Sequence, residues 1–538
     1  MADRTGADVL VSHLAARGVK RFFGVPGGDC SLDLIDAAER AGIRFVLTKT
    51  EDSAAIMAGV TAELTGSLGV LMTTRGPGLA NAVNGVAYAS LDRAPLLVIS
   101  DGYENDQAYV SHQRFDQFAL MAPLVRGSLR LDHTAALVKV PALLDTAQSA
   151  PAGPVYLEVT GRGVRPPVPA AGAAPGPAVA SPPALDPNAV IEARAMLAAA
   201  TRPAIIAGLQ TRSPRAQAGL RRLAERWCCP VYLTYMAKGA VADSDPRLAG
   251  SYIGGAGEEA TLKAADAIVL YGADPIEFPP QPWKYAAPVL DLTRYRVDRH
   301  YVTPKASLVG ELAAMAAALE TAVEGSAWTP DELAGARAEI HRRAHAGGGA
   351  AVTPQSIVEA TAAVDGSAAA RVTVDAGAHM LSVLALWKAR EVHDVLISRG
   401  LATMAFALPA AIGASLVDPD RPVIAFSGDG GLMMCAGELA TAAELGCRLT
   451  VVVFNDSSLA MIGVKQRQRK FPAAGVDYVR STDFAAVAKG FGCRGYRVEK
   501  GADLGPRLAE AMRGAGPALV DVVVDPAPYN AQLRALRG

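Results

Sequence analysis

The chain has 538 residues, of which 51% are hydrophobic and 20% charged, so it can form about three domains with sizeable cores and is not a disordered scaffold. Lys and Arg (52) balance Asp and Glu (53), and the net charge of −1 excludes an electrostatic footprint for nucleic acid or an anionic membrane. The six cysteines form no CxxC pair, the N-terminal stretch has no apolar core of a signal peptide, and the apolar runs are too short for membrane spans. We therefore expect a cytoplasmic protein with reduced thiols.

Two stretches of weak patterning divide the chain into three blocks. Residues 166–187 form a Pro/Ala/Gly-rich run without apolar periodicity, which is typical of an extended linker. A second weak region over 323–350 ends in a glycine-rich run. The blocks that remain are 1–165, 188–322 and 351–538.

Each block alternates short apolar runs with longer helical patterns. The first block has expected strands at 21–25, 45–48, 68–74 and 95–101, with helices over 50–66 and 78–92. The expected strands of the second block are 203–208, 230–234, 267–272 and 288–293, and those of the third are 372–377, 395–400, 423–430, 449–456 and 518–525. Runs of Val, Ile and Leu indicate strands buried on both faces of parallel sheets. The predicted fold class is therefore α/β, with three doubly wound parallel-sheet domains, whose ligands bind at the carboxyl ends of strands.

One strand end carries a Gly-Asp-Gly-Gly turn that runs into a helix. Gly428, Gly430 and Gly431 allow close backbone approach and leave amides free for an anion. Asp429 would repel a phosphate unless a cation lies between them, and Mg²⁺ binds through one or two carboxylates plus phosphate oxygens. The next expected strand ends at Asp456, which parallel pairing would place beside Asp429 as a second oxygen ligand. A tight surface turn is the alternative for Gly-Asp-Gly alone.

This Gly-Asp-Gly, followed about 25 residues later by Asn455-Asp456, resembles the thiamine diphosphate binding motif. The family has a second Asn where this chain has Asp456, and the substitution keeps a metal ligand while it adds a negative charge. The resemblance implies Ser458 as the third protein ligand of Mg²⁺, through its backbone carbonyl.

The first block is similar to the pyrimidine-binding domain of the acetolactate synthase-like branch of this family. Thr50-Glu51-Asp52 stands for its HEQ, Arg75–Gly78 for its SGPG, and residues 24–28 for its first strand and turn. In the third block, GLATMAFALPAAIGA (400–414) resembles GLGTMGFGLPAAIGA. The resemblance covers nearly the whole chain and is weakest in the second block.

The resemblance implies a set of cofactor contacts. Glu51 would activate the cofactor through a hydrogen bond to its pyrimidine ring, since a Glu in an apolar cleft resists ionisation. The alternative for Glu51 is a carboxylate that matches the dipole of a helix N-terminus. Met404 would hold the two rings of the cofactor bent, with an ordinary core methionine as the alternative. The expected cofactor contacts are Glu51, Pro26, Gly76, Asn81, Ala376, Gly377, Ala378, His379, Ala402, Met404, Gly428, Asp429, Gly430, Gly431, Asp456, Ser458, Leu459, Ala460 and Met461.

Two segments match the substrate end of the family's site. Gln113 matches a Gln before a helix, and His112 is the best proton-relay candidate by its ordinary pKa, unless it is a solvated loop histidine. Met461 and Ile462 match apolar residues around the substrate. Lys465 stands where many acetolactate synthases have Trp, so it is either a cation that favours an acidic substrate or a solvated lysine of a basic run.

The resemblance implies a reaction and an assembly. Thiamine diphosphate and Mg²⁺ would decarboxylate a 2-oxo acid, with pyruvate as the expected donor, and the resulting enamine would be captured by an acceptor carbonyl. A decarboxylase that releases an aldehyde is the nearest alternative; a dinucleotide-binding oxidoreductase would need a GxGxxG turn that no block shows in the right context. The blocks would be pyrimidine-binding (1–165), central (188–322) and diphosphate-binding (351–538) domains, in a homodimer or homotetramer with active sites between subunits. The central block lacks the family's flavin signature at 272–283, so FAD is not expected.

Overall fold

The computed structural model describes residues 4–107, 109–169, 174, 176–178, 181–279, 281–298, 301–348, 352–364, 366 and 369–538. Residues 170–173, 175 and 179–180 of the first expected linker, and 349–350 of the second, lie outside the described residues. Among the described residues, no helix has both the length and the apolar character needed to cross a membrane.

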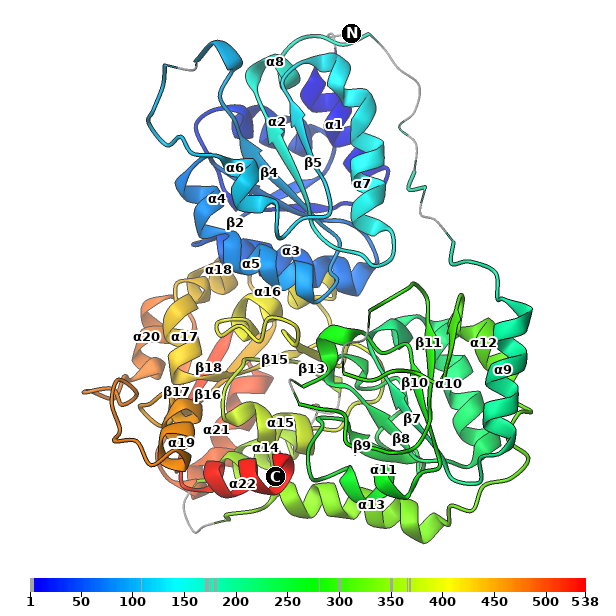
Figure 1. Cartoon of the computed structure of the whole chain (residues 1–538). Coiled ribbons are helices and arrows are strands. Elements are labelled where there is room, and N and C mark those ends of the chain that lie inside the picture. The colour runs from blue at the N-terminus through cyan, green and yellow to red at the C-terminus, as the bar shows by residue number, and fades with distance from the viewer. Residues whose placement is uncertain are drawn as a thin grey trace.

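Three parallel six-stranded sheets, each with its own helices, confirm the predicted α/β class (Figure 1). Each sheet lies within one of the three expected blocks. The first domain is at the top of Figure 1, the third domain at the lower left and the second, central domain at the lower right.

The first sheet has the order β2-β1-β3-β4-β6-β5. Its strands are β1 (Arg21–Val25), β2 (Arg44–Leu47), β3 (Gly69–Thr73), β4 (Leu96–Asp101), β5 (Ser128–Leu131) and β6 (Val155–Val159). Its helices are α1 (Gly6–Ala15), α2 (Cys30–Arg40), α3 (Glu51–Thr65), α4 (Pro77–Asn81), α5 (Val83–Leu91), α6 (Gln117–Met121), α7 (Val140–Gln148) and α8 (Gly161–Val164).

The central sheet has a different order, β12-β11-β10-β7-β8-β9, which is that of dinucleotide-binding domains. Its strands are β7 (Pro203–Ala207), β8 (Val231–Leu233), β9 (Leu248–Ser251), β10 (Ala267–Tyr271), β11 (Val289–Thr293) and β12 (Ala306–Val309). Its helices are α9 (Pro187–Ala198), α10 (Pro214–Trp227), α11 (Glu259–Ala264) and α12 (Leu312–Leu319).

The third sheet, β14-β13-β15-β16-β18-β17, repeats the strand order of the first. Its strands are β13 (Arg371–Val374), β14 (Val395–Ile397), β15 (Val423–Gly428), β16 (Leu449–Asn455), β17 (Arg494–Val498) and β18 (Ala518–Val523). Its helices are α14 (Pro354–Ala362), α15 (His379–Leu386), α16 (Ala407–Val417), α17 (Asp429–Cys435), α18 (Glu438–Glu444), α19 (Ala460–Gln468), α20 (Phe484–Gly490), α21 (Gly501–Arg513) and α22 (Pro528–Arg537).

The region 323–350, expected as a linker, contains a 15-residue helix, α13 (Pro330–Ala344). Thr329 and Glu332 form a reciprocal capping box at its start, and Pro330 occupies the first turn. Leu333 is buried in the core of the central domain. The segment is therefore an ordered connection between two domains.

The first and third domains share one hydrophobic core. Helices α3 and α16 are apolar on nearly all sides because each lies between its own sheet and the other helix. Gly413 permits this contact, since a Cβ there would lie 2.8 Å from the backbone oxygen of Met57. Figure 1 shows α3 and α5 resting on α16 and α18.

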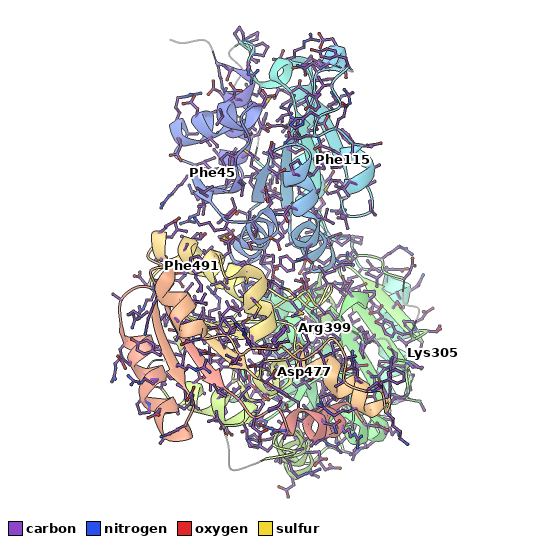
Figure 2. All side chains as sticks on the ribbon, turned by 90° about the vertical axis from the view of Figure 1, so that its left-hand side faces the viewer. Phe45, Phe115, Lys305, Arg399, Asp477 and Phe491 are labelled. Carbon is purple, nitrogen blue, oxygen red and sulfur yellow. The ribbon has the colours of Figure 1, made fainter. Side chains whose placement is uncertain are left out.

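A buried carboxylate, Asp92, joins the first domain to the turn that follows β14. Its Oδ1 accepts hydrogen bonds from the backbone N–H groups of Arg399 (2.8 Å) and Gly400 (3.0 Å). The Arg399 guanidinium donates to the backbone oxygen of Glu277 in the central domain, so Arg399 lies where the three domains meet (Figure 2). Burial is the main cause that raises the pKa of Asp92 to about 7.

We expect Asp92 to give the fold a pH dependence between about pH 4 and 7. A carboxyl group whose pKa is higher in the folded state stabilises the fold fully below its unfolded pKa, and this stabilisation is lost as pH rises toward the folded pKa. The Asp92→Asn variant cannot ionise but keeps an acceptor for both amides. From pH 4 to 8 the stability of the wild type should fall relative to Asp92→Asn, by up to about 4 kcal/mol. Thermal midpoints across this range measure the difference, with Asp503→Asn on the exposed start of α21 as the control; a pH-independent difference contradicts the expectation.

Candidate functional site

The predicted pair of carboxylates lies at the carboxyl ends of two adjacent strands. Strands β15 and β16 pair in parallel, with Gly428 opposite Phe454. Asp429 therefore begins α17 next to the end of β16, and Asp456 follows β16 directly. The structure thus brings together the two residues that the spacing predicted to meet.

Asp429 is buried and Asp456 is half-buried. Burial, followed by the charge of Asp456, raises the pKa of Asp429 to about 7. Burial raises the pKa of Asp456 to about 6. Oδ1 of Asp429 accepts from the Gly430 amide (2.7 Å), whereas its buried Oδ2 has no partner among the described residues. An unpartnered buried carboxylate oxygen beside a second carboxylate fits a divalent cation with oxygen ligands.

A cavity of about 220 Å³ surrounds this pair. Every cofactor residue predicted in the third block lines it, together with Ile462. The cavity residues are Ala376, Gly377, Ala378, His379, Ala402, Met404, Gly428, Asp429, Gly430, Gly431, Phe454, Asp456, Ser458, Leu459, Ala460, Met461, Ile462 and Tyr529. The Ser458 hydroxyl donates to Oδ1 of Asp456 (2.8 Å).

His379 supplies a neutral polar atom to the cavity. Burial lowers its pKa to about 4, and its ring stacks on Phe454 with centroids 5.1 Å apart. Its buried Nε2 has no hydrogen-bond partner among the described residues. It is therefore free to contact a bound ligand.

The turn that carries Met404 is strained and held by a buried acid. Ala402 (φ 54°) and Ala405 (φ 63°) are in the left-handed region, where the similar family motif has glycine. Oδ1 of Asp375, in the turn after β13, accepts from the amides of Phe406 (2.6 Å) and Ala407 (2.7 Å). Asp375 thus fixes the turn, which is an arrangement found at functional sites.

Sequence reasoning missed Phe454 and Tyr529 in this cavity. Tyr529 is buried on α22, and burial together with the charges of Asp456 and Asp429 raises its pKa. Its position just after β18, the neighbour of β16, was the available signal. Phe454 lies inside β16 and was indistinguishable from other core residues.

A second group of predicted residues lies at the carboxyl edge of the first sheet. Glu51 begins α3 and is 9% exposed. Its Oε2 accepts a hydrogen bond from Nδ2 of Asn81 (2.6 Å), which leaves Oε1 near Gly78. A Cβ at Gly78 would lie 3.1 Å from Oε1, so the glycine leaves space beside the carboxyl group.

The turn after β3 approaches the loop that carries His112 and Gln113. Gly76 has a φ of 68°, and a Cβ there would lie 2.8 Å from Cβ of Gln113. Gln113 itself is exposed with a φ of 55°, and the exposed His112 accepts a hydrogen bond at its backbone oxygen from Tyr103 (2.5 Å). Pro26 is exposed at the end of β1.

Gln117, which sequence reasoning missed, holds the turn at Gly76 in place through hydrogen bonds. It is buried, and its Oε1 accepts from the amide of Gly76 (2.9 Å). Its Nε2 donates to Oε2 of Glu158 (2.8 Å). Its side chain therefore ties the Gly76 turn to β6.

The cavity and the group around Glu51 lie on different domains of the chain. All residues that line the cavity belong to the third domain, and Glu51, Gly76, Asn81, His112 and Gln113 are not among them. Lys465 is exposed on α19, does not line the cavity either, and stays a prediction. The chain therefore carries two candidate half-sites, one at the carboxyl edge of the first sheet and one at that of the third.

Comparison with known proteins assigns a family model to each domain. Residues 4–120 match the N-terminal TPP binding domain of thiamine pyrophosphate enzymes, 190–319 the central domain and 375–522 the C-terminal TPP binding domain. The chain is 30% identical to the catabolic acetolactate synthase of Raoultella terrigena over 97% of this chain and 95% of that protein. It is 31% identical to the acetolactate synthase isozyme 1 large subunit of Escherichia coli (97% and 94%) and 29% identical to the acetolactate synthase of Bacillus subtilis (97% and 93%).

Proposed function

Because the chain belongs to the thiamine pyrophosphate enzyme family, in its acetolactate synthase-like branch, we propose that it is a thiamine diphosphate- and Mg²⁺-dependent decarboxylase and carboligase. The proposed donor is a 2-oxo acid, pyruvate, and the acceptor is a second carbonyl compound. The observation that carries the proposal is the Asp429–Asp456 pair with its unpartnered buried oxygen, in a cavity at the strand ends.

The residues that line the cavity fit both Mg²⁺ and thiamine diphosphate. Asp429, Asp456 and Ser458 offer only oxygen ligands, which suit Mg²⁺. The amides at the start of α17 and Nε2 of His379 would suit a diphosphate. Met404, Leu459 and Met461 give the rest of the cavity an apolar wall.

Thiamine diphosphate would supply a C2 carbanion as the nucleophile for a 2-oxo acid, and a ring that takes up the electron pair released when CO₂ leaves. Glu51 would hold a proton between its carboxyl group and the pyrimidine ring, while Asn81 orients the carboxyl through Oε2. Gln113 and His112 would bind the carbonyl oxygen and carry protons at the substrate. Met461 and Ile462 would exclude water from the reacting carbon.

We propose that the two half-sites meet across a subunit interface. Glu51 and the Asp429–Asp456 cavity lie on different domains of the chain, and we expect the complete site to combine the first domain of one copy with the third domain of another. A homodimer satisfies this requirement for two sites, and a homotetramer for four.

We expect pyruvate alone to give acetolactate, with one CO₂ released for each two pyruvates consumed. Chromatography of the products and a CO₂ assay measure this ratio. Acetaldehyde as the only product would favour the alternative of a non-ligating decarboxylase. Reactions with other 2-oxo acids and added aldehydes would then define donor and acceptor.

The central domain supports the proposal that no flavin is bound. Strands β7 and β10 flank the point where the strand order reverses, which is where dinucleotides bind in such sheets. There the buried carboxylate of Glu277 accepts from the amides of Leu209 (2.8 Å) and Asp274 (2.9 Å). Donors that could bind a phosphate are thus already engaged by an acidic side chain.

A further inference from the structure

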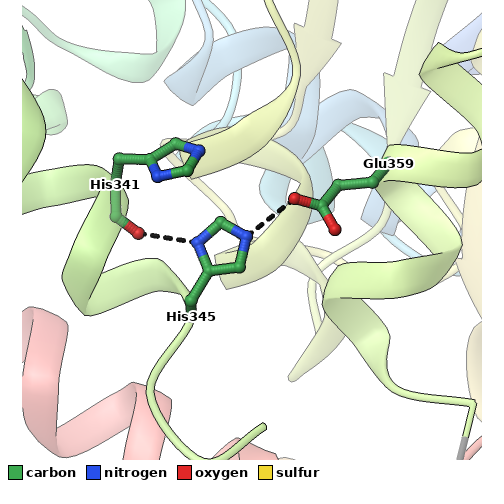
Figure 3. A group of neighbouring side chains, drawn as sticks. All are labelled: His341, His345 and Glu359. Atoms are coloured by element: carbon green, nitrogen blue, oxygen red, sulfur yellow. Dashed lines mark hydrogen bonds and ion pairs between the residues drawn. The ribbon is translucent and has the colours of Figure 1, made fainter.

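Outside the half-sites, two imidazoles and a carboxylate gather where α13 ends and α14 passes. His341 lies in the last turn of α13, His345 caps that helix, and Glu359 comes from α14 (Figure 3). One ligand atom from each lies within 4.8 Å of the others. It is the one group of three such residues found among the described residues.

The hydrogen bonds of His345 fix which nitrogen faces the carboxylate. Its Nδ1 lies 2.8 Å from the backbone oxygen of His341 and therefore donates its hydrogen there. Its Nε2 lies 2.7 Å from Oε1 of Glu359. A neutral imidazole with a hydrogen on Nδ1 presents a lone pair at Nε2, so two acceptors face each other unless a cation lies between them. That cation is either a proton or a metal ion.

The second imidazole favours the metal ion. The ring centroids of His341 and His345 are only 4.4 Å apart, which opposes a positive charge on both rings. Metal coordination uses neutral imidazoles, and a ligating histidine typically donates its other nitrogen to a backbone carbonyl, as His345 does. The cationic neighbours Arg342 and Arg343 are both paired with Glu339.

We propose that His341, His345 and Glu359 bind a zinc ion that links the connecting helix α13 to α14 of the third domain. Two imidazoles and one carboxylate suit Zn²⁺, which takes such ligands at about 2.0–2.2 Å in tetrahedral geometry. This requires ligand atoms about 3.4 Å apart, a small adjustment for side chains at the surface. The fourth ligand is water, because His341 also lines both cavities beside α13, of about 1490 and 650 Å³.

Zinc uptake by the complete protein tests the proposal. The enzyme is first saturated with thiamine diphosphate and Mg²⁺, so that the Asp429–Asp456 site is filled, and then titrated with Zn²⁺ in a calorimeter. We expect one zinc ion per chain and a raised thermal midpoint. His341→Asn, an exposed change that preserves the fold, and Glu359→Gln should each weaken zinc binding by at least about 10-fold.

His133→Asn is the matched control, because His133 also pairs with a carboxylate, Asp132 (2.6 Å), but has no second imidazole. This variant should bind zinc as the wild type does. Co²⁺ in place of Zn²⁺ should give the visible absorption of a tetrahedral site in the wild type and lose it in His341→Asn. Failure of the wild type to bind zinc, which would mean a protonated ion pair, or equal binding by His341→Asn, would overturn the proposal.

Discussion

The Glu51→Gln variant is expected to lose turnover by about 10²–10⁴-fold, the contribution of a positioned acid–base group. Glutamine keeps the size and the contact with Asn81 but cannot exchange a proton with the pyrimidine ring. Exchange of the C2 hydrogen of bound thiamine diphosphate, followed by NMR in deuterated water, should slow in parallel. Binding of the cofactor, measured by thermal shift, should change little.

Asp52→Asn is the matched control for this variant. Asp52 follows Glu51 in the first turn of α3 and senses the same helix dipole. If Glu51 serves only that dipole, both variants should have the same small effect. Unchanged C2 exchange in Glu51→Gln would refute its catalytic assignment.

The Glu51→Gln variant also tests whether the active site lies between two subunits. An oligomer that mixes Glu51→Gln chains with Asp429→Asn chains has one site with both changes and one site with neither. Dissociation and reassociation of two inactive proteins should therefore restore up to about a quarter of the wild-type activity if each site takes one half from each chain. No recovery in demonstrably mixed oligomers would contradict a site between subunits.

Asp429→Asn should weaken Mg²⁺-dependent binding of thiamine diphosphate by about 10–100-fold, because a charge-assisted contact contributes about 1.5–3 kcal/mol. The rise in thermal midpoint on addition of both ligands should shrink accordingly. Without ligands the variant should be at least as stable as the wild type, since one of two like charges is gone. Weaker ligand binding without a loss of stability distinguishes a ligand-binding acid from a structural one.

Asp420→Asn, at an exposed position before β15, is the control and should keep the full ligand response. Asp456→Ala should reproduce the loss, since Asp456 would supply the second ligand oxygen and alanine, unlike the Asn of the similar family, has none. A full ligand-induced shift in both site variants would exclude the Asp429–Asp456 pair as the metal site. In that case the cavity would need another explanation.

The central parts of the fold were predictable because buried parallel strands have a simple signature. The strands that sequence reasoning passed over are mostly half-exposed, such as β5, β12 and β17, and lack a continuous apolar run. In β6 the run is interrupted by Glu158, whose charge is paired with Arg130. Helix α13 was missed although Thr329 and Glu332 form its capping box, because the region 323–350 was interpreted as a linker that ends in a glycine-rich run.

The geometry of the candidate site in the third domain was predictable because its polar residues follow strands directly. Asp429 and Asp456 needed only strand adjacency to be placed. Residues that act across long separations gave no such signal: Asp92 meets Gly400, and Gln117 meets Gly76, only after the domains fold. Exposed loop residues such as His112 stay predictions because their contacts within one chain are too few to define a role.

The packing of α3 against α16 determines which parts of this molecule should unfold together. The two helices follow the second strand of two sheets with the same strand order, so they occupy equivalent positions in their domains and pack against each other. Their shared core couples the first and third domains, which are separated in sequence, whereas the central domain has a core of its own. Cooperative unfolding should therefore join the two outer blocks and leave the middle one as a separate thermodynamic unit. The half-sites therefore belong to one folding unit, although the proposed complete site draws on two chains.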